Sequence, residues 1–99
     1  MAELTDKVAC RTPAEGRGGV TNIPAWKFDT LRAAILDIAK DEVLFKDLPS
    51  LVASRLTYQQ KADLGSLGWH VTTVKLELEV RGEIRRTPGK GPQKLIRSI

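Results

Sequence analysis

The chain has 99 residues, a formal net charge of +4 and a single cysteine. This length provides for one domain with one modest hydrophobic core. The composition excludes a membrane span, which needs about 18 consecutive apolar residues, and an internal disulfide, which needs a second cysteine. The N-terminal sequence MAELTDKVACRT is too polar for a secretory signal. We therefore expect a cytoplasmic protein with no membrane association.

Residues 1–21 combine charged and small side chains with one proline and three glycines. Such a composition buries too little apolar surface to offset the entropy of ordering, which predicts a mobile or extended arm. Cys10 is then expected to be a free thiol in this arm, and the globular domain is expected to span residues 22–99. Arg11 and Arg17 leave two alternatives open: the arm follows a DNA groove, or it is a solvated tail.

A first helix is predicted from about Ala25 to Lys40. Asn22 can serve as its N-cap, and Pro24 lies near the first turn, where its missing N–H does no harm. The apolar residues of this segment recur at the spacing of one helical face, namely Phe28, Leu31, Ile35 and Ile38.

A second, shorter helix is predicted to begin near Lys46 or Asp47. Its apolar face consists of Leu48, Leu51, Val52 and Leu56. The signal then weakens, and only a short helical turn is expected through Gln59–Asp63 before the run GSLG breaks the chain. Trp69 follows this break, and a large aromatic residue in such a place is expected to lie in the core.

The stretch HVTTVKLELEVRGEIRR fits two structures. Alternating apolar residues from Val74 to Val80 indicate a half-buried strand, whereas the spacing of Val71, Val74 and Leu78 indicates a helix. In the helical interpretation, Thr72 or Thr73 provides the N-cap and Gly82 the left-handed C-terminal residue. A strand would have to turn at Gly82 with almost no loop, so the context favours a helix over residues 72–81.

Two short strands, Glu83–Thr87 and Gln93–Arg97, are predicted around the turn sequence Pro-Gly-Lys-Gly-Pro. The charge of the chain is concentrated here. Residues 71–99 contain seven basic and three acidic residues, whereas residues 1–70 contain nine of each. This asymmetry suggests an anionic partner such as nucleic acid, although solubility alone can also require it.

Three helices followed by a basic hairpin resemble the winged helix-turn-helix superfamily, an α+β fold that is mostly α with a C-terminal β-hairpin wing. The piece VKLELEVRGEIRR resembles the third helix, closing glycine and first wing strand, where Leu78 and Ile84 would fix the helix to the sheet. More narrowly, LGWHVTTVKLELEVRGEIRR and GPQKLIR are similar to a small family of uncharacterised bacterial proteins. That resemblance covers roughly residues 22–97.

The superfamily resemblance implies a transcriptional regulator that binds double-stranded DNA, as a dimer. Its third helix enters the major groove and its wing contacts the DNA backbone or the minor groove. By position, the groove-facing candidates are Thr72, Thr73 and Lys75. The wing candidates are Arg85, Arg86, Lys90 and Lys94.

The same helix also supports a function without DNA. Leu76 and Val80 lie four residues apart on the side opposite the apolar stripe, and no Arg, Asn or Gln is placed there to read bases. The alternative is therefore a protein–protein adaptor or dimerisation module on the same scaffold, with Leu76 and Val80 at the partner interface.

No enzymatic function is expected. His70 is the only histidine, and no Asp or Cys accompanies it at a recognisable spacing. One histidine and one cysteine cannot complete a four-ligand zinc site within a monomer. We therefore expect no catalytic residues, cofactor, metal or small-molecule ligand.

Overall fold

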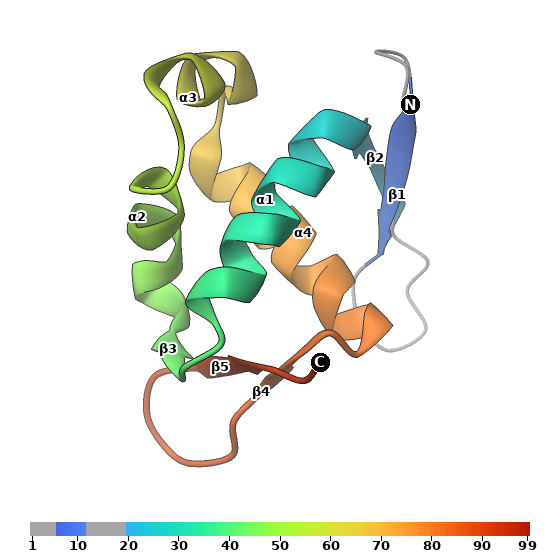
Figure 1. Cartoon of the computed structure of the whole chain (residues 1–99). Helices are drawn as coiled ribbons and strands as arrows, with labels where there is room; N and C mark the ends of the chain where they lie inside the picture. The colour runs from blue at the N-terminus through green and yellow to red at the C-terminus, as the bar shows by residue number, and fades with distance from the viewer. Residues whose placement is uncertain (1–5, 12–19) are drawn as a thin grey trace.

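The computed structural model describes residues 6–11 and 20–99. Two helices, α1 and α4, cross at the centre of the molecule, with α2 and α3 on one side and a pair of N-terminal strands on the other (Figure 1). In this part of the chain the helices are α1 (Ala25–Ile38), α2 (Leu48–Ala53), α3 (Tyr58–Leu64) and α4 (Leu67–Arg81). The structure is thus a small α+β fold with four helices, and α3 confirms the short helical turn predicted through Gln59–Asp63.

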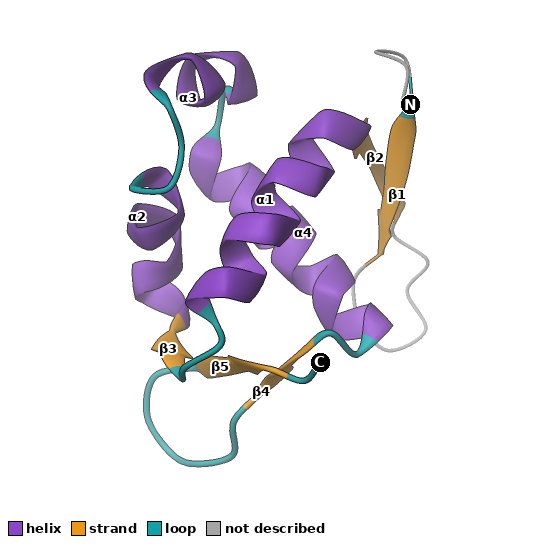
Figure 2. Ribbon diagram, in the orientation of Figure 1, coloured by secondary structure: helices purple, strands orange, loops and turns teal. Residues whose placement is uncertain are grey.

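A three-stranded antiparallel sheet closes the lower end of the helices (Figure 2). Its strands are β3 (Val43–Leu44), β4 (Ile84–Arg86) and β5 (Lys94–Arg97), in the order β3-β5-β4. The predicted C-terminal hairpin is confirmed, because Ile84 pairs with Arg97 and Arg86 with Leu95. The two-residue strand β3, which precedes α2 in the chain, was not predicted, and it attaches the hairpin to the helical body.

The ambiguous stretch is helical. Gly82 has φ +75° and its N–H bonds to the carbonyls of Leu78 and Glu79, so the predicted left-handed C-terminal residue is confirmed. The predicted start is wrong, because α4 begins at Leu67 and Thr72 and Thr73 lie inside it. The break is confined to Gly65 and Ser66, since Gly68 falls in the first turn, where a glycine interrupts few hydrogen bonds.

The N-terminal segment is also different from the prediction where the structure describes it. Strand β1 (Lys7–Arg11) pairs antiparallel with β2 (Val20–Pro24), so these residues belong to the folded domain. Cys10 is 2% exposed and contacts the main core, which corrects the expectation of a thiol in a loose arm. The remaining arm residues, including Gly16–Gly19 and Arg17, lie outside the described ranges.

The same strands correct the predicted cap of the first helix. Asn22 lies within β2 opposite Ala9, and Pro24 occupies the N-cap position without a side-chain hydrogen bond. The first helical N–H, that of Ala25, instead donates to the carbonyl of Asp6 at 2.9 Å. The N-terminal strands therefore supply a backbone acceptor where a capping side chain was expected.

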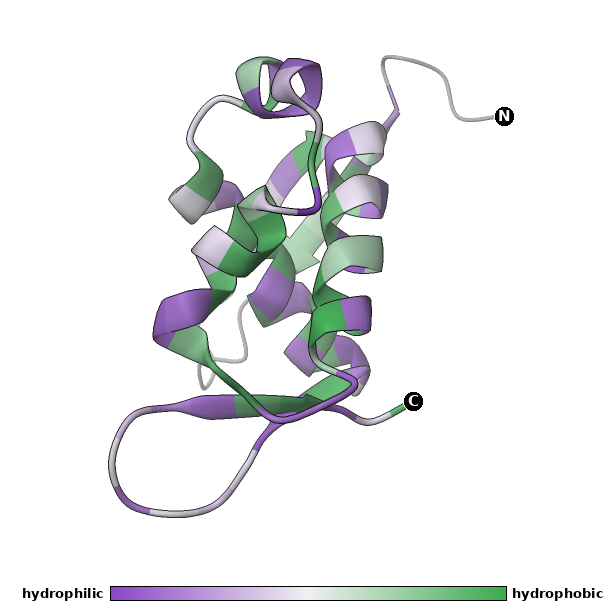
Figure 3. Ribbon diagram, turned by 60° about the vertical axis from the view of Figure 1, so that its left-hand side comes forward, coloured by the Kyte–Doolittle hydropathy of each residue, from purple (hydrophilic) through white to green (hydrophobic). Residues whose placement is uncertain are grey.

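The core lies between α1, α4 and the sheet, where the apolar faces of the helices meet (Figure 3). Leu31 and Ile35 of α1 and Val74 and Leu78 of α4 are each 0% exposed. Two predicted core positions are wrong: Leu51 is 38% and Trp69 is 49% exposed. Within the described residues, no helix is both long and apolar enough to cross a lipid bilayer.

Candidate functional site

The C-terminal hairpin (residues 84–97) presents basic side chains on a rigid base. The N–H of Thr87 donates to the carbonyl of Lys94 at 3.0 Å, which closes the ladder between the strands. At its tip, Lys90 stands between Gly89, with φ +140°, and Gly91, with φ +97°. These backbone conformations are strained for residues with a Cβ. The two glycines therefore hold the loop in the shape that exposes Lys90.

Arg85 and Lys90 are exposed and make no ion pair in the part of the chain that the structure describes. The other two predicted hairpin cations are partnered. Arg86 Nε lies 2.7 Å from Glu79 Oε1, and Lys94 Nζ lies 3.8 Å from Glu42 Oε1. The side chains of Arg86 and Lys94 are 51% and 48% exposed, so solvent reaches both. Of the four predicted hairpin cations, two are thus uncompensated and two are partnered, and Arg97 at the end of β5 is a further exposed cation without an ion pair in the described chain.

Lys75 was predicted to face a DNA groove, and the structure places it elsewhere. It is 2% exposed, and its ammonium lies 2.7 Å from both Glu79 Oε2 and Gln93 Oε1. The same ammonium sits 4.5 Å from the centre of the Phe45 ring. Burial lowers the pKa of Lys75, and the carboxylate of Glu79 opposes this effect. Lys75 therefore fastens α4 to the hairpin and cannot reach a nucleic acid from this position.

Glu79 is the centre of that attachment. Its two carboxylate oxygens bind Lys75 of α4 and Arg86 of β4, each at 2.7 Å. The Arg86–Glu79 contact is a charge-assisted hydrogen bond that ties β4 to α4, whereas the Lys75–Glu79 contact is an ion pair within α4. Polar contacts thus add to the shared core cluster of Leu78 and Ile84 in holding the hairpin against α4.

Glu77 forms a second ion cluster, under the N-terminal strands. Its carboxylate is 1% exposed and accepts hydrogen bonds from the N–H of Arg11 at 2.7 Å, from the Arg11 guanidinium and from Arg81 Nε at 2.8 Å. Burial raises the pKa of Glu77, but the hydrogen bonds from the two arginines outweigh it and lower the pKa to about 2. The charge of Arg81, which also stacks over Phe28, is thereby neutralised within the fold.

The remaining predicted residues of α4 are partly covered. Thr72, Thr73, Leu76 and Val80 are all half-buried. The large exposed apolar side chains of the described chain lie elsewhere and are Val20, Leu51, Tyr58, Trp69 and Ile99. The predicted partner interface of Leu76 and Val80 is therefore less prominent than the helical spacing suggests.

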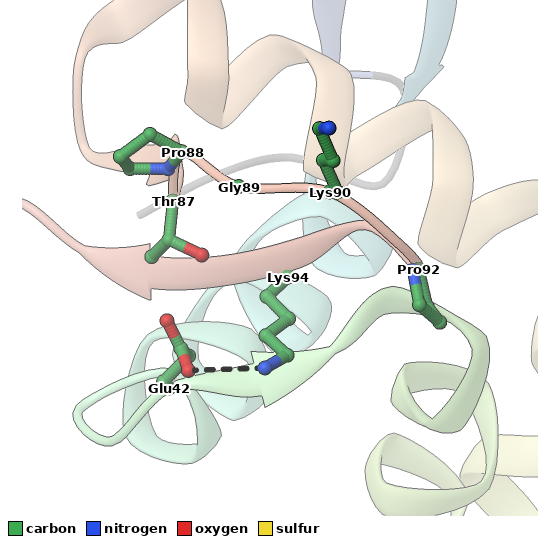
Figure 4. Close-up of a pocket in the computed structure, with 7 residues that line it drawn as sticks. All are labelled: Glu42, Thr87, Pro88, Gly89, Lys90, Pro92 and Lys94. Atoms are coloured by element: carbon green, nitrogen blue, oxygen red, sulfur yellow. Dashed lines mark ion pairs between the residues drawn. The ribbon is translucent and has the colours of Figure 1, made fainter.

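A polar recess lies between the hairpin loop and the turn that leads into β3 (Figure 4). Its volume is about 230 Å³, and its lining residues are Glu42, Thr87, Pro88, Gly89, Lys90, Pro92 and Lys94. Glu42 and Lys94 face each other with Thr87 beside them, whereas the Lys90 side chain points away from this pair. Sequence reasoning missed Glu42, because the pairing of Leu44 with Lys94 that brings it near the hairpin involves only two residues of β3.

No site for a metal was found in the described ranges, which contain no group of three or more His, Cys, Asp or Glu side chains able to hold an ion. His70 Nδ1 lies 2.6 Å from the carbonyl of Ser66, and its ring contacts Trp69 edge-on. The side chain thus packs against the first turn of α4, and it has no carboxylate partner within the described residues.

These features define a class of protein, a small α+β domain whose C-terminal hairpin is basic and fastened to its longest helix. The chain belongs to a family of unknown function, DUF6958, which matches residues 7–95. The expectation of an uncharacterised family is confirmed, and the match reaches beyond residues 22–97 at its N-terminal end to include β1. No curated protein and no solved structure is detectably similar to the chain.

Proposed function

We propose that this protein binds double-stranded DNA and acts as a transcriptional regulator with a winged helix-turn-helix architecture. In this proposal the C-terminal hairpin is the wing, and α4 corresponds to the third helix of the superfamily. The order of elements supports the assignment, since the hairpin follows the last helix directly and Leu78 and Ile84 are buried in the same core cluster.

The distribution of charge is the observation that carries the proposal. All three acidic residues after His70 are bound by basic side chains of the same chain. Glu77 is held by Arg11 and Arg81, Glu79 by Lys75 and Arg86, and Glu83 by Arg32. None of these carboxylates is therefore free to oppose a phosphate at the wing, where Arg85 and Lys90 remain exposed and uncompensated.

The wing, rather than α4, supplies most of the proposed contact. Both cations of α4, Lys75 and Arg81, are engaged by Glu79 and Glu77, and the outward positions carry Thr72, Leu76 and Val80. Contacts to phosphate give affinity and salt dependence without sequence preference, whereas base reading needs polar side chains in the groove. We therefore expect binding to depend strongly on salt and weakly on DNA sequence.

Fluorescence anisotropy with an arbitrary duplex, at low and at moderate salt, tests the proposal. The wild type is expected to bind at low salt and to lose affinity as salt rises, with a slope of about 0.9 per phosphate contacted. Replacing both Arg85 and Lys90 with Gln is expected to weaken binding and to reduce the slope by about 1.8, which corresponds to two phosphate contacts.

A matched control removes the same charge elsewhere. Lys7 and Lys61 are exposed, lie on β1 and α3 away from the sheet, and make no ion pair within the described chain (Figure 1). The double change to Gln at these positions is expected to affect affinity less than the wing variant. Equal losses from the two variants would mean that net charge alone attracts the DNA, and no binding at low salt would contradict the proposal altogether.

A further inference from the structure

The recess beside the hairpin loop contains an ion pair whose carboxylate another anion can replace. Lys94 Nζ and Glu42 Oε1 are 3.8 Å apart, beyond hydrogen-bond distance, and the two side chains are 48% and 45% exposed. The pairing of β3 with the central strand β5 brings Glu42, which directly precedes β3, close to Lys94. An exposed pair of this kind is weak, so a better anion can displace the carboxylate from the lysine.

We propose that a phosphate group of bound duplex DNA replaces the Glu42 carboxylate at Lys94, so that Glu42 is an intramolecular competitor that limits the affinity of the site. This inference rests on the proposed function. The Thr87 hydroxyl, which lies beside Lys94 (Figure 4), can donate a second hydrogen bond to the incoming phosphate oxygen.

The dimensions and chemistry of the recess fit this occupant. Its volume of about 230 Å³ exceeds the share of about 30 Å³ that one water molecule takes in the liquid. A phosphodiester group with some of its hydration can therefore enter. The Lys94 ammonium binds phosphate as a point charge, which needs no particular orientation of the anion.

Lys90 has a separate role in this arrangement. Its side chain points away from Glu42 and Lys94 (Figure 4), so it reaches a different phosphate from the one held in the recess. The wing then holds the backbone at the recess as well as at Arg85 and Lys90. Only the contact in the recess is opposed by an acidic partner in the described chain.

Anisotropy titrations of a double-mutant cycle with the same duplex test this inference. Glu42→Gln is expected to tighten binding about two- to fivefold, because it frees Lys94 from a weak ion pair. Lys94→Gln is expected to weaken binding. When Lys94 is already Gln, the additional Glu42→Gln change is expected to have little further effect, since the carboxylate then has no lysine to occupy.

Asp41→Asn is the matched control, because it removes the same charge from the adjacent residue, which makes no ion pair in the described part of the chain. It is expected to tighten binding less than Glu42→Gln. Equal effects at positions 41 and 42, or an undiminished effect of Glu42→Gln without Lys94, would overturn the inference while leaving DNA binding intact. A wild type that binds no DNA at low salt would remove the proposed function and this inference together.

Discussion

The buried carboxylate of Glu77 makes a quantitative prediction about stability. Glu77 joins α4 to the N-terminal strand β1, since it accepts hydrogen bonds from the backbone and the guanidinium of Arg11. Its pKa is lowered from 4.5 to about 2 because these bonds and that of Arg81 outweigh the opposing effect of burial. A group with a lowered pKa stabilises the folded state above its unfolded pKa and loses this contribution as the pH falls.

The contribution of Glu77 to stability follows from the size of its pKa shift. A lowering from 4.5 to about 2 corresponds to about 3 kcal/mol of folding stability. The partners are partly open to solvent, with the Arg11 side chain 52% and the Arg81 side chain 34% exposed, so screening reduces the contribution. We expect Glu77→Gln to lower the free energy of unfolding by about 2 kcal/mol at neutral pH.

Urea unfolding followed by circular dichroism provides the measurement, repeated at several values of pH. Above pH 4.5 the free energy of unfolding of the wild type is expected to exceed that of Glu77→Gln by the full difference. This difference in unfolding free energy should shrink as the pH falls toward 2. Asp37→Asn is the control, because this carboxylate is 48% exposed and its removal should change stability by less than about 0.5 kcal/mol. A difference between wild type and Glu77→Gln that is constant over this range would refute the reasoning.

Two further predictions concern glycine and cysteine. Gly82→Ala should destabilise the protein by about 1–2 kcal/mol, because φ at this residue is +75°. Gly68→Ala should stabilise it by up to about 1 kcal/mol, because position 68 is helical and a Cβ there meets open space. Urea unfolding gives the sign of each change in stability, and equal signs for the two variants would contradict the argument. Burial, reinforced by the charge of Glu77, raises the pKa of Cys10 to about 11. The thiol should therefore react slowly with a disulfide reagent at pH 8 and quickly after unfolding in urea, and rapid reaction of the native protein would show that β1 leaves α4 readily.

Several elements could be predicted because their signals are local. Gly82 ends α4 as expected, since only a residue without a Cβ adopts its left-handed conformation without strain. The hairpin strands lie within one residue of the predicted bounds at each end, because the turn sequence between them contains two prolines and two glycines. The first helix begins at Ala25 as predicted and ends two residues early, at Ile38.

The N-terminal strands could not be predicted because their stability depends on residues distant in sequence. Strand β1 has a polar, mixed composition with no clear alternation, and it becomes ordered by pairing with β2 and by the contact of Arg11 with Glu77, 66 residues away. In the sequence, Glu77 of α4 is visible only as one of three acidic residues in a basic segment. No pattern within the helix shows that its carboxylate faces inward, because the partners that stabilise it come from another element.

Partners distant in sequence also explain why the prediction that Lys75 of α4 faces a DNA groove is wrong. Lys75 stands at a position that the superfamily resemblance assigns to the groove, yet it is buried by Phe45 and bound by Gln93, which lies 18 residues later in the chain. The long Lys75 side chain ends at a carboxylate of its own helix and at the amide oxygen of Gln93, and the helical pattern gives no sign of the second partner. Of the hairpin cations proposed for DNA contact, Arg85 and Lys90 stay exposed without an acidic partner in the described chain, and for this reason the proposed function depends on the wing and not on the helix.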